Sequence, residues 1–240
     1  MIFRQYLHEQ PIIAASYLLG CSGKSQGIVV DPIAEPMFYQ EEAKHLGMSL
    51  VYVVDTHVHA DHLSTGRELA NLAGANYVLH SSVLSKGIYS VDDGDTLKLG
   101  NVQLTVWHTP GHTPEHLTLI VTDRTRGTKP WLILTGHTLM VGDMGRTELA
   151  SSAEEGAKTL FTSAQRLKKL PDFVEVYPGA FSGSVCGRGL SGKAASTIGF
   201  EKQFNKAFQI NTLQDFISLM LKDIPPRPEN FETIRNSNLG

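Results

Sequence analysis

A short apolar run that ends in a cluster of metal-ligating side chains constrains this chain more than any other feature of its sequence. Residues 50–54 read Leu-Val-Tyr-Val-Val, which is typical of a strand buried on both faces of a sheet. Directly after it, residues 56–62 read Thr-His-Val-His-Ala-Asp-His. Four potential ligands at the end of one rigid strand can be directed into one cavity, so we expect a metal or acid/base site there.

Two further histidines stand at predicted strand ends. His112 follows a Pro-Gly pair that fixes a tight turn, and His137 follows a glycine at the end of an apolar run. Eight of the ten histidines fall between residues 57 and 137, where even spacing would place about three. The pattern makes both residues candidate metal ligands. We interpret three others as ordinary surface or core histidines: His80, His108 and His116.

The remaining apolar patterns predict alternating strands and helices. Strands are expected at residues 27–30, 50–54, 97–99, 102–106, 117–122, 131–135 and 173–177. Helices are expected at residues 36–46 and after Ser152, which caps with Glu155 three residues on. Two sets of mostly antiparallel strands with helices outside indicate an α/β protein with a four-layer αββα sandwich.

The last quarter of the chain has a different character. Five glycines between residues 179 and 192 predict a long loop, because glycine at that density stabilises neither helix nor strand. Helices are expected over residues 197–209 and 213–221, and Pro225-Pro226 should break the second. We therefore expect residues 1–240 to form a single domain, in which residues 179–240 are a glycine-rich loop and a C-terminal helical extension that binds substrate.

Composition excludes several classes of protein. With 41% hydrophobic and 19% charged residues the chain can form a packed core. A net charge of −3 without a long basic run gives no electrostatic footprint for nucleic acid, so we expect a small-molecule substrate. No apolar stretch is long enough to span a bilayer, and the first residues lack signal-peptide features. Two cysteines provide no disulfide framework, so we expect a cytoplasmic protein.

These motifs carry a resemblance to a known family. The H-x-H-x-D-H at 57–62, the Gly-His-Thr at 111–113 and the Thr-Gly at 135–136 followed by Gly-Arg-Thr at 145–147 resemble the metallo-β-lactamase superfamily. Within it, the sequence is most similar to the persulfide dioxygenases (sulfur dioxygenases), with glyoxalase II, a thioester hydrolase, as a neighbour. The similarity spans nearly the whole chain, and it implies the αββα metallo-β-lactamase sandwich.

The resemblance also implies a metal. In dioxygenases of this type one Fe(II) is held by the first histidine of H-x-H-x-D-H, the histidine of Gly-His-Thr and an aspartate after Thr-Gly. The corresponding residues here are His57, His112 and His137, and His59 is a further candidate ligand. Histidine therefore replaces the usual aspartate, and Ala180 stands where the family usually has a histidine after Tyr-Pro. A dinuclear zinc site would lack two of its usual ligands, so we expect one Fe(II) per chain.

The exchange of aspartate for histidine at residue 137 changes the charge of the predicted site. Three neutral ligands leave a divalent ion one unit of charge more positive than the carboxylate version does. Such a site should bind an anionic sulfur ligand more tightly and favour Fe(II) over Fe(III). Three histidines with open positions also describe catalytic zinc, so the ligand set leaves iron and zinc open.

The same resemblance suggests roles for further residues. Asp61 and His62 are candidate catalytic groups that orient ligands and hydrogen-bond to bound water. Cys186 is interpreted as a small residue in a turn rather than a persulfide-carrying thiol, because a reactive thiol needs an exposed, electropositive setting. A guanidinium suits the carboxylate of a glutathione-type substrate. The expected substrate-binding residues are Arg146, Thr147, Arg188 and Lys193.

The leading hypothesis is a mononuclear non-haem iron dioxygenase of sulfur metabolism that oxidises glutathione persulfide, or a similar low-molecular-weight persulfide, to sulfite with O₂. The alternative is a mononuclear zinc hydrolase of glutathione thioesters, with an activated water as nucleophile and Asp61 as general base. In a third hypothesis the two exchanges have impaired catalysis, and the fold only binds a thiol or a metal. We expect no nucleic-acid or membrane partner and leave a homodimer open.

Overall fold

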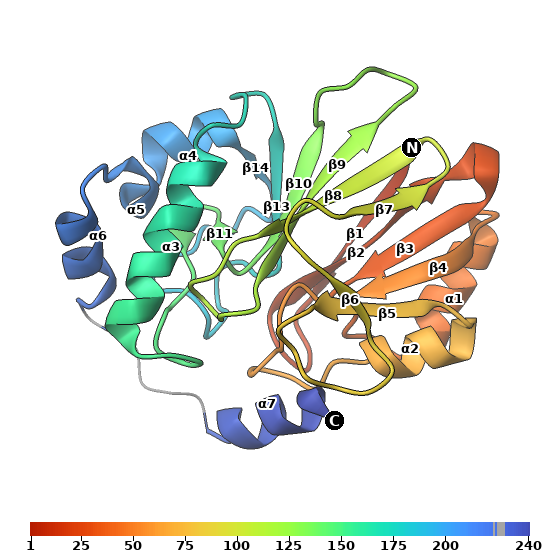
Figure 1. The fold of residues 1–240 in the computed structure, drawn as a ribbon, viewed down its shortest axis with the longest axis horizontal. Coiled ribbons are helices and arrows are strands. Elements are labelled where there is room, and N and C mark those ends of the chain that lie inside the picture. The colour runs from red at the N-terminus through yellow and green to blue at the C-terminus, as the bar shows by residue number, and fades with distance from the viewer. Residues whose placement is uncertain (223, 225–228) are drawn as a thin grey trace.

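Two β-sheets packed face to face, with helices on both outer faces, form the body of the molecule (Figure 1). The computed structural model describes residues 1–222, 224 and 229–240. In Figure 1, α1 and α2 cover the sheet on the right, and α3 to α6 cover the sheet on the left. This arrangement is the αββα sandwich that the sequence predicts, and that part of the prediction is confirmed.

The first sheet consists of the N-terminal strands in chain order: β1 (Ile2–His8), β2 (Ala14–Cys21), β3 (Gln26–Val30), β4 (Ser49–Val54), β5 (Asn76–His80) and β6 (Tyr89–Val91). The β1–β2 and β2–β3 pairs are antiparallel, whereas the β3–β4, β4–β5 and β5–β6 pairs are parallel. The expectation of mostly antiparallel strands is therefore wrong for this sheet. Parallel strands need crossover connections, which α1 (Pro36–His45) provides between β3 and β4 and α2 (Gly66–Ala73) between β4 and β5, whereas residues 81–88 join β5 to β6 without a helix.

The second sheet has the order β14-β13-β10-β9-β8-β7. Its strands are β7 (Thr96–Leu99), β8 (Val102–His108), β9 (Leu117–Asp123), β10 (Leu132–Gly136), β13 (Glu175–Pro178) and β14 (Ser196–Thr197). The two predicted hairpins, β7–β8 and β9–β10, are present and antiparallel. A separate two-stranded ribbon follows His137 and consists of β11 (Leu139–Met140) and β12 (Asp143–Met144).

The helices of the second half follow the predicted pattern with one interruption. α3 (Ala153–Leu167) begins after Ser152, whose side chain accepts a hydrogen bond from the Glu155 N–H as expected. The single helix expected over residues 197–209 is wrong, because it is divided into α4 (Ile198–Phe204) and α5 (Lys206–Gln209). Asn205 has extended backbone angles, and its side chain caps α5 by accepting from the Phe208 N–H.

Two more helices complete the chain. α6 (Leu213–Met220) matches the prediction, while α7 (Phe231–Leu239) has no counterpart in it. The expected break at Pro225-Pro226 lies outside the described residues. The short 3₁₀ helix η1 (Ser22–Lys24) joins β2 to β3. No helix among the described residues has both the length and the apolar character needed to cross a bilayer.

Three layers of buried apolar side chains hold the sandwich together. The central layer lies between the two sheets and includes Leu19, Val54 and Leu119, all without solvent contact. A second layer packs the outer face of one sheet against α1 and α2, and a third packs the other sheet against α3, α5 and α6. Because burial of apolar surface is the main stabilising term in folding, these layers fix the relative position of the two sheets.

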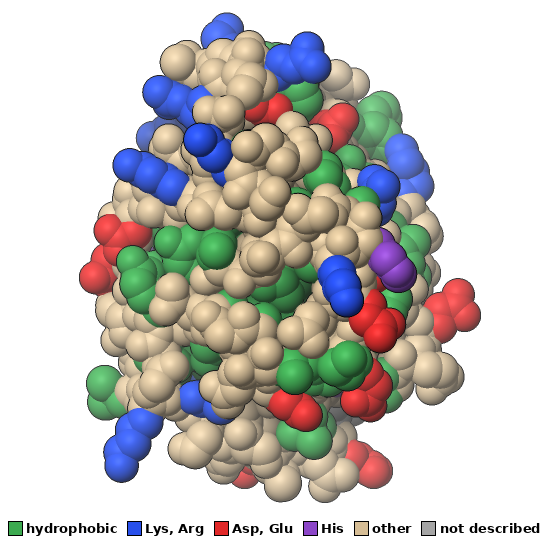
Figure 2. All heavy atoms as spheres, turned by 90° about the vertical axis from the view of Figure 1, so that its right-hand side faces the viewer, with side chains coloured by type: hydrophobic (Ala, Val, Ile, Leu, Met, Phe, Trp, Pro, Cys, Tyr) green, Lys and Arg blue, Asp and Glu red, His purple; other side chains and the backbone are tan. Residues whose placement is uncertain are grey.

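The surface over the first sheet and its helices carries mixed charges. Figure 2 shows most of the basic side chains towards the top of this face and most of the acidic ones in its lower half, with small apolar patches between them.

Candidate metal centre

The candidate metal centre lies where strand ends of both sheets meet. His57 follows β4 of the first sheet, and His112 and His137 follow β8 and β10 of the second. The Leu117 N–H donates to the Thr56 carbonyl at 2.7 Å, which ties the two sheets together at this edge. All three histidines are buried, and one ring nitrogen of each lies within 4.8 Å of the other two. His112 Nε2 and His137 Nδ1 are only 3.2 Å apart.

Neighbouring groups determine which nitrogen of each ring is available. The Thr56 hydroxyl donates to Asp31 Oδ2 at 2.9 Å, so it can only accept from His57 Nδ1, which is 3.0 Å away. His112 Nδ1 donates to the carbonyl of Arg146 at 2.8 Å. In both rings the proton is therefore on Nδ1 and the lone pair is on Nε2, where a cation can bind. In this structure the lone pair of His112 Nε2 accepts a hydrogen bond from His137 Nδ1 at 3.2 Å, which a cation would replace.

The three histidines are neutral at physiological pH. Burial lowers the pKa of all three, to about 3 for His112 and to about 4 for His137, and the other rings of the cluster lower the pKa of His57 further. A metal requires neutral imidazole as its ligand. The donor set therefore fits a single divalent transition metal, and both Fe(II) and Zn(II) accept three nitrogens with open positions.

A second group of polar side chains lies beside the first. His59, Asp61 and His62 offer ligand atoms that lie within 4.8 Å of one another. His59 Nε2 is held by Asp31 Oδ1 at 3.2 Å, and His62 Nδ1 by Asp61 Oδ1 at 2.9 Å. The buried His59 Nδ1 and His62 Nε2 have no hydrogen-bond partner among the described residues. The structure thus brings these predicted site residues together around two unsatisfied nitrogens.

The charges of this second group differ from those of the first. Burial acts to lower the pKa of His59, but the carboxylates of Asp31 and Asp61 outweigh it and raise that pKa well above its usual value. Burial acts to raise the pKa of Asp61, but His62 and His59 hold it well below its usual value. His59 is therefore protonated on both ring nitrogens, and a metal would have to displace a proton from it, whereas His57, His112 and His137 each carry a single ring proton and keep one lone pair.

His116, which we expected to be an ordinary surface or core histidine, instead supports the candidate ligand His137. Its Nε2 accepts the His137 backbone N–H at 3.0 Å, and its Nδ1 faces the Thr138 hydroxyl at 2.9 Å. Gly136 precedes His137 with φ 47°, and a Cβ there would lie 2.4 Å from Thr56 Oγ1 and 2.7 Å from His116 Nε2. Only glycine fits this approach. The signal in the sequence was the position of His116 directly before β9, at the strand edge that carries the other ligands.

Cys186 also lies at the centre. Its Sγ is 3.5 Å from Asp61 Oδ2, and Cys186, Asp61 and His137 offer atoms within 4.8 Å of one another. Burial, together with the Asp61 carboxylate, raises the pKa of this thiol well above its usual value. The thiol is therefore protonated and donates towards Asp61. Its place in a turn gives no hint of this contact, since the two residues are far apart in sequence.

The predicted substrate-binding residues occupy different surroundings. Arg146 is buried, forms an ion pair with Glu148 and donates to the Val185 carbonyl at 3.2 Å. Thr147 is buried and donates to the Ala153 carbonyl at 3.0 Å, at the start of α3. Their roles towards a substrate stay predictions.

The two cations of the glycine-rich loop lie near the C-terminal helices. Arg188 is bound to Asp143 at 3.2 Å and to the Leu219 carbonyl at 2.8 Å, beside a cavity of about 710 Å³. The Lys193 ammonium lies 4.9 Å from the centre of the Phe200 ring. These contacts connect the loop to Asp143, α4 and α6, and the substrate-binding roles of both cations stay predictions.

The chain departs from the pattern of the family it resembles at His137 itself and at Ala180, whose neighbour Gly179 packs against His137. Gly179 packs so closely against this ring that a Cβ would lie 3.1 Å from its Cδ2, and the next residue is the buried Ala180. Asp143, the nearby carboxylate in sequence, instead accepts the N–H groups of Arg188 and Gly189. Among the described residues Asp143 joins none of the ligand groups.

Similar proteins were found by sequence and by structure, although no family model matches the chain. The mitochondrial persulfide dioxygenase ETHE1 of Bos taurus is 27% identical over 244 residues, which cover 100% of this chain and 88% of the relative. A metallo-β-lactamase from Staphylococcus aureus subsp. aureus COL is 33% identical with a TM-score of 0.92, covering 99% of this chain and 72% of that one. ETHE1 from Myxococcus xanthus is 29% identical with a TM-score of 0.85, covering 100% and 98%.

Proposed function

Because the chain belongs to the metallo-β-lactamase superfamily and resembles persulfide dioxygenases along its whole length, we propose that it is a mononuclear iron persulfide dioxygenase. The substrate is glutathione persulfide or a similar low-molecular-weight persulfide. In the overall reaction, persulfide, O₂ and water give a thiol and sulfite. The outer sulfur loses four electrons, and O₂ takes them up.

The observation that carries this proposal is the trio His57, His112 and His137. Its three rings are neutral and converge, and the Nδ1 protons of His57 and His112 are already engaged elsewhere. Fe(II) held by this trio would supply open coordination positions and the redox chemistry that the oxidation of a persulfide by O₂ requires. A set of neutral ligands suits an anionic persulfide, because no ligand of the trio carries a negative charge that would repel it.

The residues around the trio have separate tasks in this proposal. Asp61 is ionised, because His62 and His59 hold its pKa well below its usual value, and it is the carboxylate that would accept a hydrogen bond from the substrate or from water. Protonated His59 lies between the carboxylates of Asp31 and Asp61, at 3.2 Å and 3.7 Å, and its charge holds the Asp61 carboxylate in place. Because the side chains of the trio, His59 and Asp61 are almost inaccessible to solvent, they would keep bulk water from the reacting sulfur.

The region from residue 179 onwards is assigned to substrate recognition. Its loop reaches the metal centre through Cys186 and is tied at its other side to α6 through Arg188. Arg146 adjoins the same loop through its bond to the Val185 carbonyl. A carboxylate of the thiol carrier would be bound by guanidinium groups of this region in bidentate geometry.

The test is oxygen consumption with metal analysis of the same sample. Protein purified without chelators should contain about one iron per chain, and the iron-loaded protein should consume O₂ when glutathione persulfide is added. The His57→Ala variant, which lacks one ligand of the trio, is the matched control and should do neither. No O₂ uptake above background at saturating persulfide would contradict the proposal.

The group formed by His59, Asp61 and His62 favours a second candidate, a zinc-dependent hydrolase of glutathione thioesters. Its two unsatisfied nitrogens and the ionised Asp61 could orient a water molecule for attack on a carbonyl carbon. Hydrolysis of S-lactoylglutathione at the same rate with and without O₂, by protein that contains zinc, would identify this activity. Metal without either turnover would indicate an impaired member of the family.

A further inference from the structure

The C-terminal helix α7 attaches to the segments that carry the candidate metal ligands. In Figure 1 it lies at the lower edge of the molecule, beneath both halves of the sandwich. We propose that Asn238, in its last turn, is a positioning residue of the metal centre and that α7 is the element that presents it. The proposal rests on the proposed function only in that it takes a metal to be held by the 57–62 motif and its neighbours.

The side-chain amide of Asn238 forms hydrogen bonds with backbone groups of residues 59–64, which we call the metal-binding turn. Its Nδ2 donates to the His59 carbonyl at 2.9 Å and to the His62 carbonyl at 2.8 Å. Its Oδ1 accepts the Ser64 N–H at 3.0 Å. A carbonyl can only accept and an N–H can only donate, so these three partners fix the orientation of the amide.

These hydrogen bonds hold a part of the motif that lies outside every helix and strand. Residues 55–65 connect β4 to α2 and belong to no helix or strand, so their peptide groups need partners from elsewhere. Asn238 binds the carbonyls on both sides of Asp61 and so holds the turn on which the Asp61 carboxylate is mounted. A shift of this turn would move His59, Asp61 and His62 together.

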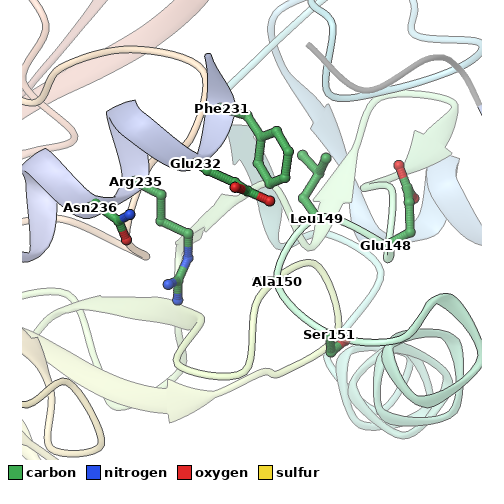
Figure 3. A pocket seen from close by; sticks show the side chains of 8 residues that line it. All are labelled: Glu148, Leu149, Ala150, Ser151, Phe231, Glu232, Arg235 and Asn236. Carbon is green, nitrogen blue, oxygen red and sulfur yellow. The ribbon is translucent and has the colours of Figure 1, made fainter. Parts of the chain in front are cut away.

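A second contact of α7 reaches the segment that carries His112. Arg235 lies 3.6 Å from Oε1 of the buried Glu115, and the same oxygen accepts the Val58 N–H at 3.0 Å. Figure 3 shows Arg235 extending away from α7, while Phe231 and Glu232 face Leu149 across a cavity of about 390 Å³. Residues 235 and 238 are three apart, which places them on one face of the helix. This face therefore joins both ligand-bearing segments.

Asn238 differs from Arg235 in what it contacts. The Asn238 amide bonds directly to the backbone of two motif residues, whereas Arg235 acts through Glu115. If α7 only shielded the metal centre from solvent, loss of the Asn238 contact and loss of the Arg235 contact would weaken metal binding equally. If Asn238 positions the metal-binding turn, its loss should have the larger effect on the metal itself.

The experiment uses the full-length protein and Co(II), whose visible absorption reports coordination geometry. Asn238→Ala should weaken Co(II) binding about 10- to 100-fold, as loss of groups that orient metal ligands typically does, and should change the shape of the absorption bands. Asn238→Asp keeps an acceptor for the Ser64 N–H but places negative charge against two carbonyls, so it should not rescue binding. Arg235→Ala should weaken binding less than Asn238→Ala.

Asn236→Ala is the matched control. It removes the same side chain from the same helix, but Asn236 is exposed and has no side-chain hydrogen bond among the described residues. Its Co(II) affinity and spectrum should equal those of the wild type, and thermal unfolding should show that all variants are folded. Alanine is a better helix former than asparagine, so neither substitution should unwind α7 by propensity alone.

The outcomes separate the two proposals. Unchanged Co(II) binding and spectrum in Asn238→Ala, or equal losses in Asn238→Ala and Arg235→Ala, would overturn the positioning role and leave the proposed function intact. A wild-type protein that binds no Co(II) would overturn both. Co(II) binding that depends on Asn238, in a protein that consumes no O₂ with persulfide, would support the positioning role and contradict the dioxygenase.

Discussion

At the residue scale, the charge of the candidate metal centre depends on which side chains stand nearest to the three ligand nitrogens. His57, His112 and His137 are neutral because burial lowers the pKa of each. The closest approach among them is between His112 and His137, whose nitrogens would repel each other if both were protonated. A bound cation would replace this contact with two metal–ligand bonds, so the metal-free centre is arranged to accept positive charge.

Replacement of His137 by aspartate should lower the reduction potential of bound iron. A carboxylate removes one unit of positive charge from the site and stabilises Fe(III) more than Fe(II). We expect His137→Asp to keep about one iron per chain and His137→Ala to lose at least about tenfold in affinity. Redox titration and elemental analysis measure both. His80→Asp makes the same exchange at a histidine that stacks on His108 instead of joining the trio, and it should leave the potential unchanged.

The stability of the metal-free protein should fall as the pH is lowered from about 6.5 towards 4. The folded pKa values of His112, about 3, and His137, about 4, lie below that of an unfolded histidine, so the unfolded chain binds more protons in this range. Each such residue should contribute up to about 1.4 kcal/mol per pH unit. Urea unfolding of the wild type and of His137→Gln at pH 5 and 6 tests this. An equal slope in the two proteins would contradict the assignment.

Residue types and spacing were enough to predict the ligand trio as candidates, because strand-end positions share one edge of a sandwich. They were not enough for His116 or Cys186. The role of His116 depends on the hydrogen bond that it accepts from the His137 backbone N–H. The role of Cys186 depends on its contact with Asp61, which is 125 positions away in the sequence. Such relations depend on how the loops fold back, which local pattern does not encode.

At the scale of elements, the contact between α3 and the turn before His112 determines where that ligand stands. Gly111 has φ 146°, and a Cβ there would lie 2.4 Å from Cβ and 2.5 Å from Cα of Leu160 in α3. The Ser163 hydroxyl in the same helix donates to the Pro110 carbonyl at 2.8 Å. The helix and the turn are thus in backbone contact, and the position of His112 follows that of α3.

Gly111→Ala should therefore weaken both the fold and the metal centre. Gly127 is the matched control, because it has nearly the same φ, 143°, but no atom within 4 Å of a Cβ. We expect Gly111→Ala to reduce the free energy of unfolding by about 1–3 kcal/mol more than Gly127→Ala, the usual cost of overpacking. Urea unfolding and Zn(II) titration measure the two effects. Equal losses in both variants would mean that backbone strain alone, and not the contact with α3, is responsible.

The elements with strong local signals were predicted, and those set by tertiary contacts were not. α3 was identified from its capping serine and apolar stripe, and the β7–β8 and β9–β10 pairs from alternation. The break at Asn205 was missed because its side chain bonds to Glu201 and to the Met140 and Asp143 carbonyls, which compete with helix formation. α7 buries no residue and has little apolar periodicity, so its contacts with the motif were invisible in the sequence.

At the scale of the whole molecule, the candidate metal centre connects the two sheets. His57 is carried by the first sheet, and His112 and His137 by the second. A metal bound to all three would cross-link the halves of the sandwich beyond what the central apolar layer provides. Binding to the folded state alone would then add to the stability of the whole molecule.

Metal binding should raise the thermal stability of the protein, and chelation should lower it. With free Zn(II) at 100 times its Kd, the expected gain in the free energy of unfolding is about 2.7 kcal/mol. Thermal unfolding with Zn(II) and with EDTA measures this difference. His57→Ala removes the ligand of the first sheet and should abolish most of the gain. A gain that persists in this variant would mean that the ion binds elsewhere.

The near-complete burial of the three ligands has a kinetic consequence for anything that exchanges with the centre. His57, His112 and His137 are only 1%, 3% and 1% exposed, so a chelator the size of EDTA has to wait for the loops around them to part. Metal release should then become independent of chelator concentration once the chelator is in excess, with a rate equal to the rate of opening. In the proposed dioxygenase, the same interval would limit how quickly one persulfide can follow another, whereas dioxygen, being far smaller, need not wait for it.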